Sequence, residues 1–104
     1  MATGGLEVRH AGGVVRVPAG RPFVIGRGPD ADLDLPHPRV SRRHAVVELT
    51  AEGWTLTDRS ANGTYLGEDR VTVLRLERPV VVRLGRGSGA TTVCLLYTSP
   101  SPRD

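Results

Sequence analysis

The segment from Arg39 to His44 reads Arg-Val-Ser-Arg-Arg-His, so a hydroxyl and two guanidinium groups stand directly before an apolar run. That run, from His44 to Thr50, is rich in β-branched residues, and we expect an irregular loop that leads into a strand. Such a loop can present several donors to one anion, and arginine matches the planar, multi-oxygen geometry of a phosphate. From this segment alone, an anion-binding loop and a solvated basic loop are equally good interpretations.

Two further segments favour the binding loop. The chain carries, in this order, the motifs Gly26-Arg27, Ser41-Arg42-Arg43-His44 and Asn62-Gly63-Thr64. Asn-Gly is a strong turn pair, because both residues tolerate positive φ. In this order and at these spacings the motifs resemble the core signature of the forkhead-associated (FHA) domain of bacterial type. The resemblance covers about residues 6–93.

The resemblance implies a phosphopeptide-binding signalling module without a cofactor or metal. Its partner would be a protein that carries phosphothreonine, the product of a Ser/Thr kinase. Arg27, Ser41 and Arg42 would contact the phosphate. Asn62 would hold the backbone of the extended ligand. Arg39 would lie on the rim, where it either reads an acidic side chain third after the phosphothreonine or remains a surface charge.

Three residues would support the site without touching the ligand: Gly26, His44 and Gly63. In the family, the histidine at the position of His44 forms hydrogen bonds that brace the binding loops. The chain departs from the family pattern at Ala61, where many members carry Thr or Arg, so one side-chain contact is missing.

Short apolar runs recur between turn residues, and no stretch holds a helical period for three turns. This pattern is typical of an all-β sandwich or barrel. The FHA resemblance implies the sandwich, with two sheets and about 10–11 short, mostly antiparallel strands. The strands that we expect, including two hairpins at 6–17 and 64–73, lie at residues 6–10, 14–17, 22–27, 33–35, 44–50, 54–58, 64–66, 70–73, 79–84 and from 91 onward.

The length of 104 residues fits one domain. Residues 1–5 are interpreted as a flexible lead-in and residues 6–93 as the FHA domain. No leader with a charged start and an apolar centre opens the chain, and no run is long enough to span a membrane. We therefore expect a cytoplasmic domain without membrane contact, placed by analogy at the N-terminus of a larger bacterial protein.

Residues 94–104 resemble one reading frame of a transposase adapter used in sequencing libraries. We expect them to be a read-through tail that is not native, which would leave Cys94 without a role. The alternative is an ordinary Ser/Pro-rich linker. In both cases Cys94 to Tyr97 are apolar enough to complete a final strand.

A hydrolase is an alternative function, in which some of the same residues would act in catalysis. Ser41, His44 and Asp58 have the side chains of a catalytic triad, which must lie within mutual reach beside an oxyanion hole. No Gly-x-Ser-x-Gly elbow is present. We therefore expect a binding module and not an enzyme.

A nucleic-acid module would use Arg39, Arg42 and Arg43. Aromatic residues make up only 4% of the chain and no stacking motif is present, so we expect no nucleic-acid partner. A scaffold that binds without phosphate, as some FHA domains do, would not need the complete phosphate-binding set.

Overall fold

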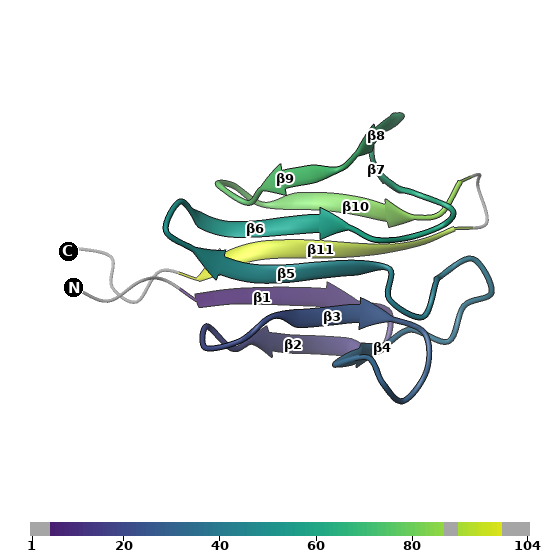
Figure 1. Ribbon diagram of the computed structural model, residues 1–104, viewed down its shortest axis with the longest axis horizontal. Helices are drawn as coiled ribbons and strands as arrows, with labels where there is room; N and C mark the ends of the chain where they lie inside the picture. The colour runs from purple at the N-terminus through teal and green to yellow at the C-terminus, as the bar shows by residue number, and fades with distance from the viewer. Residues whose placement is uncertain (1–4, 87–89, 99–104) are drawn as a thin grey trace.

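The computed structural model describes residues 5–86 and 90–98, which form two β-sheets packed face to face (Figure 1). The six-stranded sheet has the spatial order β2 (Gly13–Val17), β1 (Gly5–His10), β11 (Thr91–Thr98), β10 (Val80–Leu84), β7 (Thr64–Leu66) and β8 (Asp69–Val71). The five-stranded sheet has the order β4 (Leu33–Asp34), β3 (Phe23–Gly26), β5 (Ala45–Thr50), β6 (Gly53–Asp58) and β9 (Val73–Arg75). The prediction of an all-β, two-sheet sandwich is confirmed.

Antiparallel pairing dominates the described strands. The one exception among them is β4, which lies parallel to β3. No helix capable of crossing a membrane occurs in the described part of the chain.

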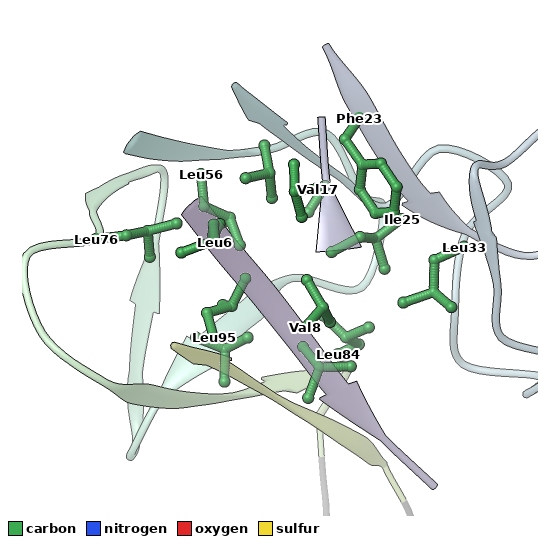
Figure 2. Close-up of a cluster of buried hydrophobic side chains, with 14 of the residues drawn as sticks. Leu6, Val8, Val17, Phe23, Ile25, Leu33, Leu56, Leu76, Leu84 and Leu95 are labelled. Carbon is green, nitrogen blue, oxygen red and sulfur yellow. The ribbon is translucent and has the colours of Figure 1, made fainter. Parts of the chain in front are cut away.

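The core forms because side chains alternate along each strand between the interior and the solvent. In β1, Leu6 and Val8 are buried while Arg9 is exposed. Figure 2 shows buried side chains of both sheets meeting between the layers, among them Leu6, Val8, Leu84 and Leu95 from one sheet and Phe23, Ile25 and Leu56 from the other. Each fully buried aliphatic side chain contributes about 1.5–3 kcal/mol.

Strand β11 includes residues from the segment that we expect to be a read-through tail. Leu95 is fully buried and pairs with Val8 on one side and Val80 on the other. Cys94 to Thr98 therefore complete the final strand, and their foreign origin stays a prediction. Gly5, placed in the lead-in by the sequence, already belongs to β1. Residues 1–4 and 99–104 lie outside the described residues.

The strand expected at residues 70–73 is divided in the structure. Val71 ends β8 in the six-stranded sheet, and Val73 begins β9 in the five-stranded sheet. Between them, the carbonyl of Thr72 accepts a hydrogen bond of 2.8 Å from the backbone N–H of Asp58. The chain crosses between sheets at Thr72, a step that local hydrophobic alternation does not encode.

Three strand ends deliver the candidate residues to one end of the sandwich. Strands β3 and β6 end there, and β5 begins there (Figure 1). The loop before β5 lies directly on the end of β3, since Arg27 N–H donates to the Ser41 carbonyl at 3.0 Å and His44 N–H donates to the Ile25 carbonyl at 2.9 Å. This contact requires glycine at position 26, because a Cβ there would lie 1.9 Å from the carbonyl oxygen of Arg42.

We predict that Gly26→Ala destabilises the domain. A methyl group at position 26 must push the loop off β3, and overpacking of this kind costs about 1–3 kcal/mol. Urea unfolding followed by tryptophan fluorescence measures the loss. Gly20→Ala is the matched control, because its Cβ meets nothing within 4 Å. An unchanged midpoint for Gly26→Ala would contradict the close approach.

Candidate functional site

The loops that follow β3, precede β5 and follow β6 form the candidate site. Their arginines line two adjoining pockets. The Arg27 pocket, of about 440 Å³, is lined by Arg27, Gly28, Pro29, Asp30 and Arg42. The serine pocket, of about 490 Å³, is lined by Asp30, Ser41, Arg42, Arg43, Arg59 and Ala61. Since Arg42 and Asp30 belong to both walls, the structure places Arg27, Ser41 and Arg42 around two adjoining pockets.

The loop that carries Ser41 is held by a buried imidazole. His44 is fully buried, and its Nδ1 accepts a hydrogen bond of 3.1 Å from the backbone N–H of Ser41. Because Nδ1 is an acceptor, Nε2 carries the hydrogen and donates to the carbonyl of Gly63 at 2.9 Å. The neutral imidazole therefore joins the loop before β5 to the loop after β6.

The pKa of His44 lies below its ordinary value of 6.5. Burial is the main cause, because it disfavours the charged imidazolium, and the charge of Arg70 adds to it. The hydrogen bond to Gly63 and the negative charge of Asp58 oppose this shift without cancelling it. As the pH falls below 6.5, His44 takes up a proton in the unfolded chain, whereas in the folded domain it stays neutral to a lower pH.

The hydroxyl of Ser41 also lies between the two loops. Its Oγ accepts a hydrogen bond of 3.2 Å from the backbone N–H of Ala61. The hydroxyl keeps its hydrogen for donation, and Ser41 and Ala61 both line the serine pocket. Ser41 can thus donate to an anion in that pocket while its oxygen holds the neighbouring loop.

Asn62 and Arg39 form a contact with each other and are not among the residues that line the two pockets. The side-chain N–H₂ of Asn62 donates to the Arg39 carbonyl at 3.1 Å. The guanidinium of Arg39 donates to the carbonyl of Arg86, beyond the end of β10. Asn62 is exposed, and its amide retains a second hydrogen and an oxygen for a ligand.

A buried carboxylate that the sequence analysis considered only as a triad member holds the loop after β6. One oxygen of Asp58 accepts hydrogen bonds from the hydroxyls of Ser60, at 2.6 Å, and Thr64, at 2.9 Å. The other oxygen pairs with Arg70 at 3.3 Å. Burial raises the pKa of Asp58, but these hydrogen bonds outweigh it and leave the pKa below 3.8. The spacing Asp58-x-Ser60, shortly before Asn62-Gly63, is the sequence signal that could have indicated this role of Asp58.

The same contacts show how the three triad side chains are used. Ser41 meets His44 through its backbone N–H and not through its hydroxyl. Both ring nitrogens of His44 bond to backbone groups, and the carboxylate of Asp58 bonds to Ser60, Thr64 and Arg70. The three side chains therefore hold loops, and they are not joined to one another by the hydrogen bonds of a Ser-His-Asp triad. Among the described residues, no cluster of three or more His, Cys, Asp or Glu side chains could hold a metal.

The electrostatics of the pockets favour an anion. Among residues 5–86 and 90–98, the ion pairs are Arg21–Asp32, Arg70–Asp58 and Arg75–Glu77. The four arginines that line the two pockets take part in none of these pairs and are exposed. Asp30 is the one acidic residue in the walls. The arrangement can bind a multi-oxygen anion through several guanidinium N–H groups at once.

Known proteins are similar to this chain in sequence and in fold. The profile of the FHA domain matches residues 23–88. The ABC transporter ATP-binding/permease protein Rv1747 of Mycobacterium tuberculosis is 34% identical over 85 residues, which cover 81% of this chain but only 10% of the transporter. The crystal structure of the Mycobacterium tuberculosis Rv1747 FHA-1 domain matches with a TM-score of 0.86 at 31% identity, covering 93% of this chain and 99% of that one.

A further solved structure comes from a structural and functional analysis of phosphothreonine-dependent FHA domain interactions. It matches with a TM-score of 0.76 at 28% identity and covers 88% of this chain and 95% of the other. The motifs, the two-sheet sandwich and these relatives agree, and the chain belongs to the FHA domain family.

Proposed function

We propose that this domain binds phosphothreonine-containing segments of partner proteins, with Arg27, Ser41 and Arg42 holding the phosphate. The observation that carries the proposal is the convergence of several guanidinium groups and the Ser41 hydroxyl on adjoining pockets. Within the described residues, these guanidinium groups form no ion pair. Membership of the FHA family supports it, as does the related domain whose interactions depend on phosphothreonine. Charge-assisted hydrogen bonds contribute about 1.5–3 kcal/mol each. Three of them suffice for roughly micromolar binding once ordering costs are subtracted.

Asn62 and Arg39 have roles beside the phosphate in this proposal. The free hydrogen and oxygen of the Asn62 amide match the backbone carbonyl and N–H of an extended peptide. Arg39 keeps spare N–H groups, since a guanidinium has five and the contact to Arg86 engages only one nitrogen. Arg39 can therefore read an acidic side chain on the rim without losing that contact.

We propose a cytoplasmic module of a larger protein, acting by binding and not by catalysis. The related stretch of Rv1747 is a tenth of that transporter, which supports a module within a longer chain. Kinases need ATP, so phosphothreonine partners arise where ATP is abundant, in the cytoplasm. Ser41, His44 and Asp58 serve the loops, which supports a site without chemistry of its own.

We predict that Arg27→Ala strongly weakens phosphopeptide binding and leaves the fold intact. Arg27 is exposed at the end of β3 and its side chain is not part of the core. Loss of its charge-assisted bonds should weaken binding by about tenfold to more than a hundredfold. Calorimetric titration of a phosphothreonine peptide, with circular dichroism of the variant, measures both effects. Arg16→Ala, on β2, is the control. Unchanged affinity in a folded Arg27→Ala variant would disprove the phosphate contact.

We predict that phosphothreonine binds better than phosphoserine, and that the unphosphorylated peptide hardly binds. One buried methyl contributes about 0.8 kcal/mol, and a shaped pocket raises this to about 1–3 kcal/mol, so the ratio should lie between about fourfold and a hundredfold. Ala61 is a small wall of the serine pocket, which places the ratio toward the lower end. Dissociation constants of three peptides that differ at this residue, at one salt concentration, provide the measurement. Equal binding of all three would refute the proposed function.

The proposed role of His44 is to position the loops, so we predict that His44→Ala acts through stability. Ser41 N–H loses its acceptor, and the free energy of unfolding should fall by about 1–3 kcal/mol at pH 7.5. The difference in free energy of unfolding between the variant and the wild type should become smaller as the pH falls below 6.5. Only the wild type has His44, and it loses stability when this residue is protonated in the unfolded chain. Urea unfolding at several pH values measures this. Wild-type stability with lost binding would instead make His44 a ligand contact.

A further inference from the structure

Two arginines of the serine pocket are not assigned to the phosphate in the proposed function. Arg43 follows Arg42 directly and precedes the buried His44. Arg59 follows β6, and its backbone N–H donates to the carbonyl of His44 at 2.8 Å. This hydrogen bond fixes the backbones of the two arginines at neighbouring strand ends. Both side chains are exposed and line the same pocket as Ser41.

The charge in the pockets exceeds what one phosphate neutralises. Four arginines stand against the single carboxylate of Asp30 in the walls of the two pockets. A phosphothreonine carries a charge of about −1.5 to −2 at neutral pH. With Arg27 and Arg42 engaged by that phosphate, Arg43 and Arg59 still face the pocket with Asp30 as their one acidic neighbour there.

We propose that the preferred ligand carries a second anionic side chain within two residues of the phosphothreonine, and that Arg43 and Arg59 select it. This inference rests on the proposed function and names the substrate class of the same site. Successive residues of an extended peptide advance about 3.3 Å, so the second group reaches within about 7 Å of the phosphate. A carboxylate and a second phosphate share the chemistry that a guanidinium recognises.

A peptide explains the pocket better than a nucleic acid. A nucleic acid also offers closely spaced anions, but single strands are held by bases stacked on aromatic side chains. The residues that line the two pockets include no aromatic side chain. Exposed Asn62, beside the pockets, has an amide suited to a peptide backbone.

The experiment uses the whole chain and three phosphothreonine peptides that differ only in the residues beside the phosphothreonine. The first has neutral neighbours, the second has glutamate at the two positions on each side, and the third has a second phosphothreonine two residues away. The unphosphorylated form of the first peptide and a single-stranded oligonucleotide competitor are measured beside them. Dissociation constants are measured by fluorescence anisotropy at one ionic strength. The variant Arg43→Gln/Arg59→Gln is compared with Arg16→Gln/Arg75→Gln, which removes the same charge from exposed residues that line neither pocket.

The wild type should bind both acidic peptides about three- to tenfold more tightly than the neutral peptide, the range for one or two exposed arginine–anion pairs. That preference, taken as the ratio of the two dissociation constants for each protein, should fall to about onefold in the Arg43/Arg59 variant and persist in the control. A stronger preference for the doubly phosphorylated peptide identifies phosphate as the second group, and a preference for the glutamate peptide identifies carboxylate.

Three results would overturn the inference. The first is equal binding of the neutral and acidic peptides by the wild type. The second is a preference that persists in the Arg43/Arg59 variant or disappears equally in the control. The third is a single-stranded oligonucleotide that competes for the site as strongly as the acidic peptides do. Failure of the wild type to distinguish the neutral phosphopeptide from its unphosphorylated form would instead refute the proposed function, and this inference with it.

Discussion

The geometry of the binding end depends on one buried imidazole that joins two loops. His44 accepts from the backbone of Ser41 and donates to the backbone of Gly63, so its two ring nitrogens face groups of opposite character. Only a neutral imidazole with its hydrogen on Nε2 satisfies both partners. The Gly63 carbonyl also accepts from Gly85 N–H at 2.8 Å, which extends the connection to the loop after β10. A single side chain therefore controls the spacing of loops that are distant in sequence.

The loop that carries Ser41 is held mainly through its backbone. The absence of a Cβ at Gly26 lets the carbonyl of Arg42 lie against the end of β3, and the backbone N–H of Ser41 is held by His44. Because the backbone supplies these contacts, the side chains of Arg42 and Arg43 remain exposed and free of ion pairs within the described residues. Exposed guanidinium groups lose little by staying in water, so the loop can be rigid while its charges remain available.

A separate carboxylate organises the opposite wall of the site. Asp58 bonds to both ends of the short loop that contains Asn62, through the hydroxyls of Ser60 and Thr64. Ser60 Oγ in turn accepts from the backbone N–H of Gly63 at 2.7 Å. Buried polar groups are costly unless they are hydrogen-bonded, and here they satisfy each other within one turn. The turn that presents Ala61 and Asn62 is thus held independently of any ligand.

The sequence by itself determined most of the strands, the sandwich and the identity of the three motifs. Alternation of apolar residues is a local signal, and β1, β5 and β6 therefore appear close to their expected positions. The preference of glycine and of Asn-Gly pairs for turns also depends only on neighbouring residues. The structural roles of Gly26 and Gly63 could therefore be assigned from the sequence.

Only the tertiary structure decided which residues meet. The crossing between sheets at Thr72, the bond from Asn62 to Arg39, and the shared pocket of Arg43 and Arg59 all depend on contacts between distant segments. Their geometry follows from strand register and from the hydrogen bonds of His44 and Asp58, since a shift of one residue in register sends each side chain to the opposite face. No local pattern in the sequence carries that information.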